Sequence, residues 1–201
     1  FTDYRVNYVV SGGQTMNPST EDFVTAISKV HADTIYILPN NSNIIMAAKQ
    51  AAEVTEDKKI IVIETKSVPQ GLSACISFNP EEEVDANTEA MNEAITLVKT
   101  GSVTYAVKDT TVDGKQINSG DYMAILEKEI IFNEKDKLAV TKELIKQMCD
   151  EDTEVVTLIK GSEATDEECE EVRQFIEQNY NVDIDVEDGQ QPVYSFIIGA
   201  E

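Results

Sequence analysis

The sequence predicts an α/β protein of two lobes: a parallel α/β lobe in residues 1–100 and an α+β lobe with a largely antiparallel sheet in residues 101–201. Two observations predict this fold class. The first half alternates short apolar runs with helical patterns, which is typical of a parallel sheet covered by helices on both faces. After Gly101, alternating apolar residues and an Asp-Gly pair are typical of antiparallel hairpins.

The first lobe is expected to contain three strands, each followed by a helical pattern. The helix after the first strand opens with a capping pattern at Ser19 and places Phe23, Ile27 and Val30 on one face. The expected strands are "VNYVV" (6–10), "TIYILP" (34–39) and "KKIIVIET" (58–65), and the expected helices are 19–30, 42–54, 70–78 and 86–99.

The second lobe is expected to begin near residues 99–102, where Gly101 ends the preceding helix. Asp113 and Gly114 form a hairpin signal between two alternating segments. A helix follows, with Val140, Leu144, Ile145 and Met148 in line, and a second helix with Cys169, Val172 and Ile176 inward. The expected strands are 103–110, 121–132, 154–159, 181–186 and 192–198, and the second helix is expected over 165–180.

Charge argues against some partners. The formal net charge is −22, and residues 101–201, with 9 basic and 24 acidic groups, hold most of it. Nucleic acid and anionic membranes are bound chiefly through Lys and Arg clusters, so neither is an expected partner. The acidic second half is interpreted as a solubilising surface, with an acidic face for a basic protein as the alternative. No apolar run is long enough to span a membrane.

Cysteine usage indicates a reducing compartment. Cys75, Cys149 and Cys169 lie far apart in the sequence and form no CxxC or Cys/His spacing. We therefore expect free thiols and a cytoplasmic location. The chain begins with Phe1 and shows no signal peptide, so we expect a fragment of something longer whose first lobe is truncated at its start.

Polar loops follow all three expected strands of the first lobe: "SGGQTMNPST", "PNNSN" and "ETKSVPQG". Each leads into a helix N-terminus, where free backbone N–H groups favour an anion. Turn and cap formation is the alternative explanation for the same residue types. The ligand-binding or partner-facing candidates are Ser11, Gly12, Gly13, Gln14, Thr15, Asn17, Asn40, Asn41, Ser42, Asn43, Gln70 and Gly71.

Candidate catalytic groups are few. The loops match neither GxxxxGK[ST] nor GxGxxG, so nucleotide binding is weakly supported. His31 is the only histidine and is expected at the surface, and no His/Cys cluster suggests zinc. Asp109, Asp113 and Asp121 are expected to be turn residues and not magnesium ligands. We therefore expect no catalytic residues, no metal and no cofactor in this chain.

Several long phrases resemble a known family. They are "GGQTMNPSTEDF", "ILPNNSNIIMAAKQAA", "KSVPQGLSA", "VKTGSVTYAVKDTTVDGKQINSGDYMAI" and "GQQPVYSFIIGAE". Together they resemble the C-terminal domain of the ATP-binding subunit of bacterial fatty acid kinase, also described as dihydroxyacetone-kinase-like. The resemblance covers nearly the whole chain.

The resemblance implies a DegV-like fold and a part of a kinase whose ATP-binding domain lies outside this chain. It implies that the partner is a DegV-type fatty-acid-binding subunit, and it is compatible with a homodimer formed through the full-length protein. DegV-type proteins hold the fatty acid carboxylate with a Thr-Ser-Gln loop and a Ser-Gly pair. Here Gln14 is kept within "GGQT", but "NNSNII" offers no Ser-Gly pair. A DegV-like scaffold that has become a docking domain is the better inference.

The sequence leaves three functions to compare. The first is a non-catalytic domain that engages the acyl-binding subunit for fatty acid phosphorylation. The second is a module that binds a fatty acid or small anion in a DegV-like cleft, supported by the three loops at helix N-termini. The third, an independent hydrolase or phosphatase, is disfavoured because the sequence shows no nucleophile paired with a base.

Overall fold

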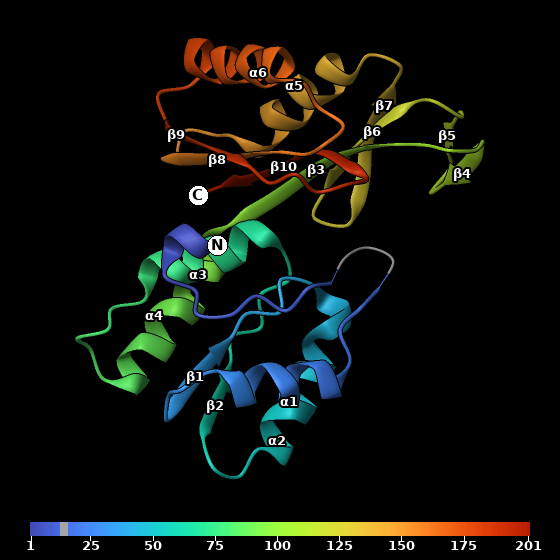
Figure 1. Cartoon of the computed structure of the whole chain (residues 1–201). Coiled ribbons are helices and arrows are strands. Elements are labelled where there is room, and N and C mark those ends of the chain that lie inside the picture. The colour runs from blue at the N-terminus through green and yellow to red at the C-terminus, as the bar shows by residue number, and fades with distance from the viewer. Residues whose placement is uncertain (13–15) are drawn as a thin grey trace. The chain divides into compact units, whose positions relative to one another are not determined.

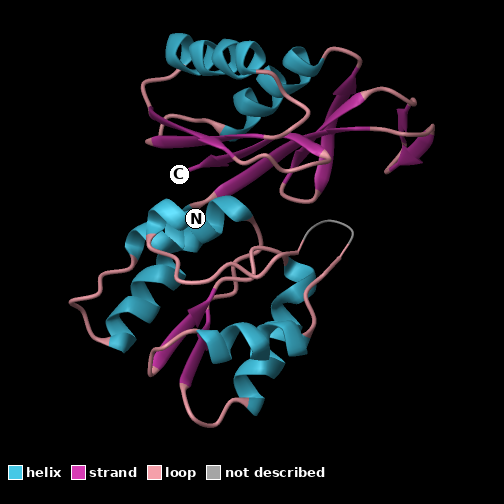
Figure 2. Cartoon of the chain, in the orientation of Figure 1, coloured by secondary structure: helices cyan, strands magenta, loops and turns pink. Residues whose placement is uncertain are grey.

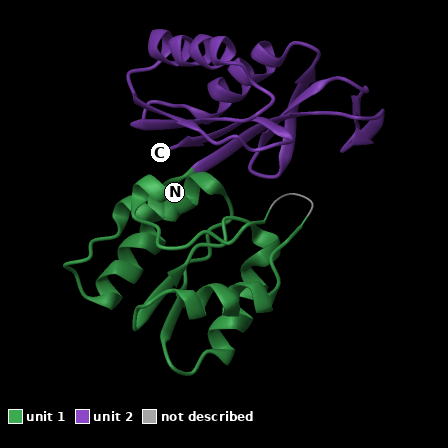
Figure 3. Cartoon of the chain, viewed as in Figure 1, with its two compact units in different colours: residues 1–98 green, residues 99–201 purple. Residues whose placement is uncertain are grey.

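The structure is a computed structural model that describes residues 1–12 and 16–201. Residues 1–98 and 99–201 form two compact units (Figure 1, Figure 3). Each unit has its own secondary structure and its own apolar core, and the two are described in turn.

The first unit contains a short parallel sheet with helices. Strands β1 and β2 pair in parallel from Thr34 opposite Lys59 to Ile37 opposite Val62. The elements of this unit are η1 (Thr2–Tyr4), α1 (Thr20–Lys29), β1 (Thr34–Ile37), η2 (Ser42–Ile44), α2 (Ile45–Val54), β2 (Lys59–Val62), α3 (Val68–Ser77) and α4 (Val84–Leu97).

The two faces of this sheet pack against different helices, which explains why its strands are continuously apolar. On one face, Ile35 and Ile37 pack with Phe23 of α1 and Ala48 of α2. On the other face, residues that alternate with these pack with α3 and α4. Figure 2 shows the two short strands among the four helices of this unit. The expected doubly wound arrangement is confirmed for this part of the chain.

The first expected strand is wrong. Residues Val6–Val10 form no strand, and their backbone makes no hydrogen bond to β1. Tyr8 is 41% exposed and Val9 is 55% exposed, so the apolar pattern that predicts a strand is not buried here. The sheet of this unit has two strands among the described residues, where the sequence predicts three.

The second unit is a six-stranded sheet with two helices. Its strand order is β7-β6-β3-β10-β8-β9, and all neighbours are antiparallel except β8 and β9. The elements are β3 (Lys99–Tyr105), β4 (Thr110–Val112), β5 (Lys115–Ile117), β6 (Tyr122–Leu126), β7 (Glu129–Glu134), α5 (Lys137–Met148), β8 (Val155–Lys160), α6 (Asp166–Asn179), β9 (Asp183–Asp188) and β10 (Tyr194–Ala200). The expected largely antiparallel sheet is confirmed.

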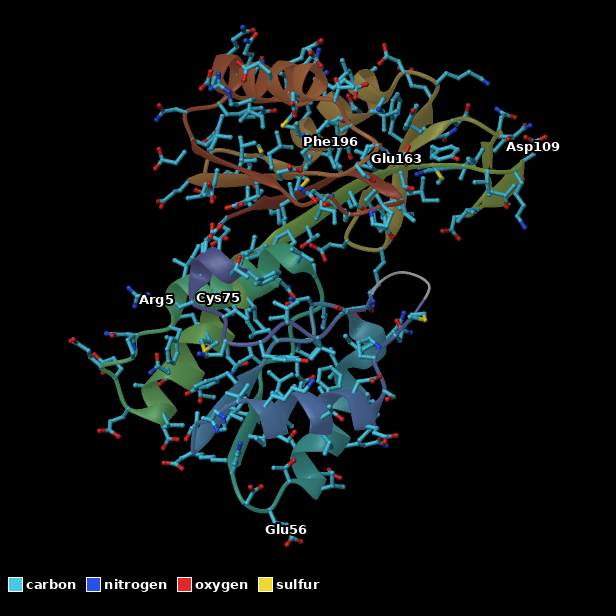
Figure 4. All side chains as sticks on the ribbon, in the orientation of Figure 1. Arg5, Glu56, Cys75, Asp109, Glu163 and Phe196 are labelled. Atoms are coloured by element: carbon cyan, nitrogen blue, oxygen red, sulfur yellow. The ribbon has the colours of Figure 1, made fainter. Side chains whose placement is uncertain are left out.

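Helices α5 and α6 cover one face of this sheet (Figure 2). Phe196, labelled in Figure 4, is fully buried in the core between the sheet and these helices. The helical stripes expected from the sequence are confirmed, because all of their members are buried. They are Val140, Leu144, Ile145 and Met148 of α5 and Cys169, Val172 and Ile176 of α6.

Two segments of this unit differ in detail from the prediction. The sequence predicts one strand over 121–132, but the segment forms the hairpin β6–β7, whose turn places Glu127 at a φ of 56°. The segment 103–110 ends its main strand at Tyr105 and resumes pairing only at Thr110. Asp113 and Gly114 make the expected tight turn, with φ angles of 49° and 79°.

Candidate functional site

The polar residues that follow β1 and β2 meet at one end of the sheet. The Thr65 hydroxyl donates to Asn40 Oδ1 at 2.8 Å and accepts from the Asn40 N–H, also at 2.8 Å. Thr65 is fully buried, so this reciprocal pair locks the two loops together away from water. Asn40 adopts a φ of 58°, a left-handed conformation that Asn tolerates better than most residues.

Gly71 allows α3 to approach this pair. A Cβ atom at Gly71 would lie 2.1 Å from Asn40 Oδ1. The position therefore requires glycine because of close packing against the Asn40 side chain. Of the predicted candidates, the structure brings Asn40 and Gly71 into direct contact, with Thr65 as the residue that connects them to β2.

The neighbouring asparagines act on local structure. Asn41 Oδ1 accepts from the Asn43 N–H at 2.9 Å and caps η2. Ser42 is the first residue of η2 and is half-buried, and the side chain of Asn43 is exposed. For Asn41, the alternative explanation of a cap is the one that the geometry supports.

The loop after β2 is also internally bonded. Ser67 caps α3 by accepting from the Gln70 N–H at 3.3 Å. Gln70 Oε1 accepts from the Lys66 N–H at 2.7 Å, and Gln70 Nε2 donates to the Ile95 carbonyl of α4 at 3.1 Å. The Gln70 side chain therefore connects the loop to α4.

The first loop is the most exposed of the three. Ser11, Gly12 and Asn17 are exposed, and Met16 has 76% of its surface exposed. Gly12 lies close to the Pro18 ring, since a Cβ there would be 2.6 Å from Pro18 Cδ. Gly13, Gln14 and Thr15 lie outside the described residues.

An apolar cavity of about 810 Å³ runs along β1 in this unit. Its lining includes every residue of β1 and none of β2, so it lies along the strand edge that β2 does not use. Segment Val6–Val10 also lines it, as do Phe23 and Ile27 of α1 and residues of α3 and α4. Cys75, labelled in Figure 4, is one of these. No sequence motif indicates this cavity, because it results from the absent third strand.

A second polar cluster, in the unit of residues 99–201, surrounds Asp121. The sequence predicts a turn residue here, but Asp121 is only 4% exposed. Its carboxylate accepts from the Asn118 N–H at 2.9 Å, from Asn118 Nδ2 at 3.3 Å and from Asn133 Nδ2 at 3.1 Å. The Asn118 N–H, followed by the other donors, holds the pKa of Asp121 below its ordinary value. Asp121 therefore anchors the base of the β4–β5 hairpin.

The three thiols are poor nucleophiles. Burial raises the pKa of Cys75, raises that of Cys149 to about 11 and raises that of Cys169. His31 is exposed. Within residues 1–12 and 16–201, no group of three His, Cys, Asp or Glu residues is placed to hold a metal ion. Over the same ranges, no helix is long and apolar enough to cross a membrane.

The fold is that of DegV-like proteins. The chain superimposes on the Thermotoga maritima protein TM841, described as fatty acid binding, with a TM-score of 0.70 and 13% identity over 100% of this chain and 80% of that one. The Streptococcus pneumoniae fatty acid kinase B3 protein, loaded with linoleic acid, matches with a TM-score of 0.64 and 16% identity over 92% of this chain and 76% of that one. At these identities the likeness establishes the fold.

The family is established by sequence. The model of the FakA-like C-terminal family of fatty acid kinase matches residues 1–201, and the chain belongs to this family. Protein YloV of Bacillus subtilis (strain 168) is 48% identical over 202 residues, which are 100% of this chain and 36% of YloV. The chain thus spans about a third of the length of this relative.

Proposed function

We propose that this chain is the docking region of a larger fatty acid kinase polypeptide. In this proposal it engages a DegV-type, acyl-binding partner protein and does not itself transfer phosphate. Its membership of the FakA-like family supports a role in such a kinase. The linoleic acid bound to the structurally similar B3 protein of Streptococcus pneumoniae supports an acyl-binding protein as the partner class.

The observation that carries the docking role is the use of polar groups at the strand ends. Asn40, Thr65 and Gln70 use their side chains to bond the loops to one another and to α4. Among the described residues of these loops, the side-chain amides and hydroxyls best placed to hold a carboxylate are thus engaged in structure. A scaffold of this kind presents a rigid surface better than it captures a small anion.

A non-catalytic role fits the chemistry of the side chains. The thiols have raised pKa values, and the single histidine lies on the surface. A phosphoryl transfer site needs positioned cations and donors around the nucleotide phosphates. We expect the activity to require polypeptide outside residues 1–201.

The exposed part of the strand-end loops is the surface we expect to contact the partner. Met16 and Asn43 are exposed there, and neither side chain forms a hydrogen bond within the described ranges. Exposed apolar side chains such as Met16 are frequent in protein interfaces. We call Met16, Asn17 and Asn43 the loop surface.

The test is titration of the chain with the purified acyl-binding partner, loaded with fatty acid, by calorimetry. We expect Met16→Ser with Asn43→Ala to weaken binding about tenfold, about 1.4 kcal/mol, because truncating an interface anchor costs more than 1 kcal/mol. The control is Val54→Ser, which changes a residue of comparable exposure, 64%, at the far end of α2. No binding by the unmodified chain, to loaded or to empty partner, would refute the docking role.

The cavity along β1 favours a second candidate function, binding of a fatty acid by this chain. Its size lies in the range of small-molecule sites, about 300–1,000 Å³. If this function holds, palmitate should raise the melting temperature of the chain, since a ligand that prefers the folded state stabilises it. An unchanged melting temperature across a range of chain lengths would remove this candidate.

A further inference from the structure

We propose that the cavity along β1 is the place of a β-strand supplied by the polypeptide that precedes Phe1 in the longer protein. This strand pairs with the free edge of β1 and also contacts Val6–Val10. The proposal concerns the completion of the first unit and is independent of the docking role.

The outward edge of β1 has unused backbone groups. The carbonyls of Asp33 and Ile37 accept from Lys59 and Ile63 on the β2 side. Because backbone groups of alternate residues point to the same side of a strand, Thr34 and Tyr36 point to the other side. No backbone group in the described ranges bonds to them there. Such an edge is a template for another strand.

The sheet is also too small for its surroundings. Parallel sheets are normally covered on both faces, and two strands alone rarely form a stable sheet. Here helices are present on both sides, yet Ile35 and Tyr36 of β1 remain half-buried. A neighbouring strand would bury these side chains and the exposed side chains of Tyr8 and Val9.

The size and lining of the cavity fit a strand. Four residues extend about 13 Å, occupy about 5 Å between neighbours and about 10 Å between layers, so a strand as long as β1 needs about 600 Å³. The cavity holds about 810 Å³. It is lined by Phe23 and Ile27 from one face and by Cys75 and Met91 from the other. The occupant should therefore be apolar on both faces, as in a central parallel strand.

The longer protein is the source we infer for this strand. The family is defined as a C-terminal region, and residues 1–201 match only 36% of YloV. The fold comparison agrees, because a fifth of TM841 has no counterpart here although all of this chain is covered. Phe1, Asp3 and Tyr4 line the cavity, so a preceding segment would need only a short connection.

The test compares the 201-residue chain with the full-length protein by amide hydrogen exchange, followed by NMR. We expect the Thr34 and Tyr36 amides to exchange at least tenfold more slowly in the full-length protein. The Ile35 and Ile37 amides, which face β2, are the controls and should change much less. Fast exchange of Thr34 and Tyr36 in both proteins would overturn the proposal. Equal protection in both would overturn it too, because Val6–Val10 would then close onto β1 unaided.

A variant decides the case in which all four amides slow together. Thr34→Pro removes an outward N–H and leaves the β2 ladder intact, as proline does at a strand edge. We expect it to lower the melting temperature of the full-length protein by several degrees more than that of the 201-residue chain. An equal effect on both would refute strand addition. Release of a fatty acid from the full-length protein on extraction, with Thr34 and Tyr36 unprotected, would assign the cavity to a lipid instead.

Discussion

Asn40, Thr65 and Gly71 show how a loop that could hold a ligand is used to hold the fold. The asparagine backbone is left-handed, its amide oxygen accepts from a buried hydroxyl, and the glycine gives its side chain space. Each of the three residue types is necessary for a different physical reason. The result is a rigid connection between β1, β2 and α3.

Gly71→Ala tests this connection. The added methyl group would lie 2.1 Å from Asn40 Oδ1, so the Asn40–Thr65 pair must move. We expect a loss of about 1–3 kcal/mol in the free energy of unfolding, as for other overpacked sites. Urea denaturation measures it, with Ser77→Ala in the same helix as control. A loss no larger than that of Ser77→Ala would show that the contact is not needed.

Asp121 provides a pH-dependent test. Because its pKa is lowered in the folded state, its ionised form stabilises the fold above its ordinary pKa of 3.8. That stabilisation is lost as the pH falls from 3.8 through the lower folded pKa. We expect Asp121→Asn to lower the melting temperature at pH 7 and to flatten its decline in acid.

The control for Asp121 is Asp113→Asn in the same hairpin. Asp113 is exposed at the turn and has a positive φ, which Asn also tolerates. Its melting curve should follow that of the unmodified chain at every pH. If Asp121→Asn behaves in the same way, the buried carboxylate does not anchor the hairpin.

Single residues of these loops can be identified from sequence, but their partners cannot. Gly71 and Asn40 are candidates because loops after parallel strands are the usual place for polar sites. That Gln70 bonds to Ile95 depends on how α3 packs on α4, which no local pattern encodes. The burial of Asp121 is not predictable, because Asp-rich segments near a hairpin are also typical of exposed turns.

Among the elements, α5 and α6 are joined by one carboxylate with two roles. Glu168 accepts from the Thr165 N–H at 2.9 Å and completes the capping box of α6. The same side chain pairs with Lys137 of α5 at 2.9 Å, and this lysine is only 12% exposed. The start of α6 is thus fixed both within the helix and to its neighbour.

Two substitutions separate these roles. Glu168→Gln keeps a capping acceptor and removes the charge, so we expect a loss of less than about 1 kcal/mol in the free energy of unfolding. Glu168→Ala removes both and should cost about 1 kcal/mol more, as for a lost cap. Thermal unfolding of both variants measures the difference. Equal losses would mean that capping contributes nothing here.

Element prediction is correct where periodicity is strong and fails where pairing decides. The stripes of α5 and α6 require only helical spacing. Val6–Val10 has the composition of a strand, but a strand also needs a neighbour, and none of the described residues supplies one. The division of 121–132 into β6 and β7 depends on the positive φ of Glu127, a residue with little turn preference.

At the scale of the whole molecule, the chain combines a DegV-like fold with a family defined as part of a fatty acid kinase. Fold class can be predicted from strand and helix order, and family from long shared phrases. The cavity cannot be predicted, because it arises from an unpaired strand edge. The net charge of −22 also indicates that any partner surface facing this chain should be neutral or basic.

Native mass spectrometry of the chain, alone and mixed with the acyl-binding partner, tests the docking role most directly. We expect the chain alone at its own mass of 22.3 kDa, with no bound lipid, and a complex with the loaded partner in which the acyl chain stays with the partner. A chain that carries a fatty acid and forms no complex would contradict the account.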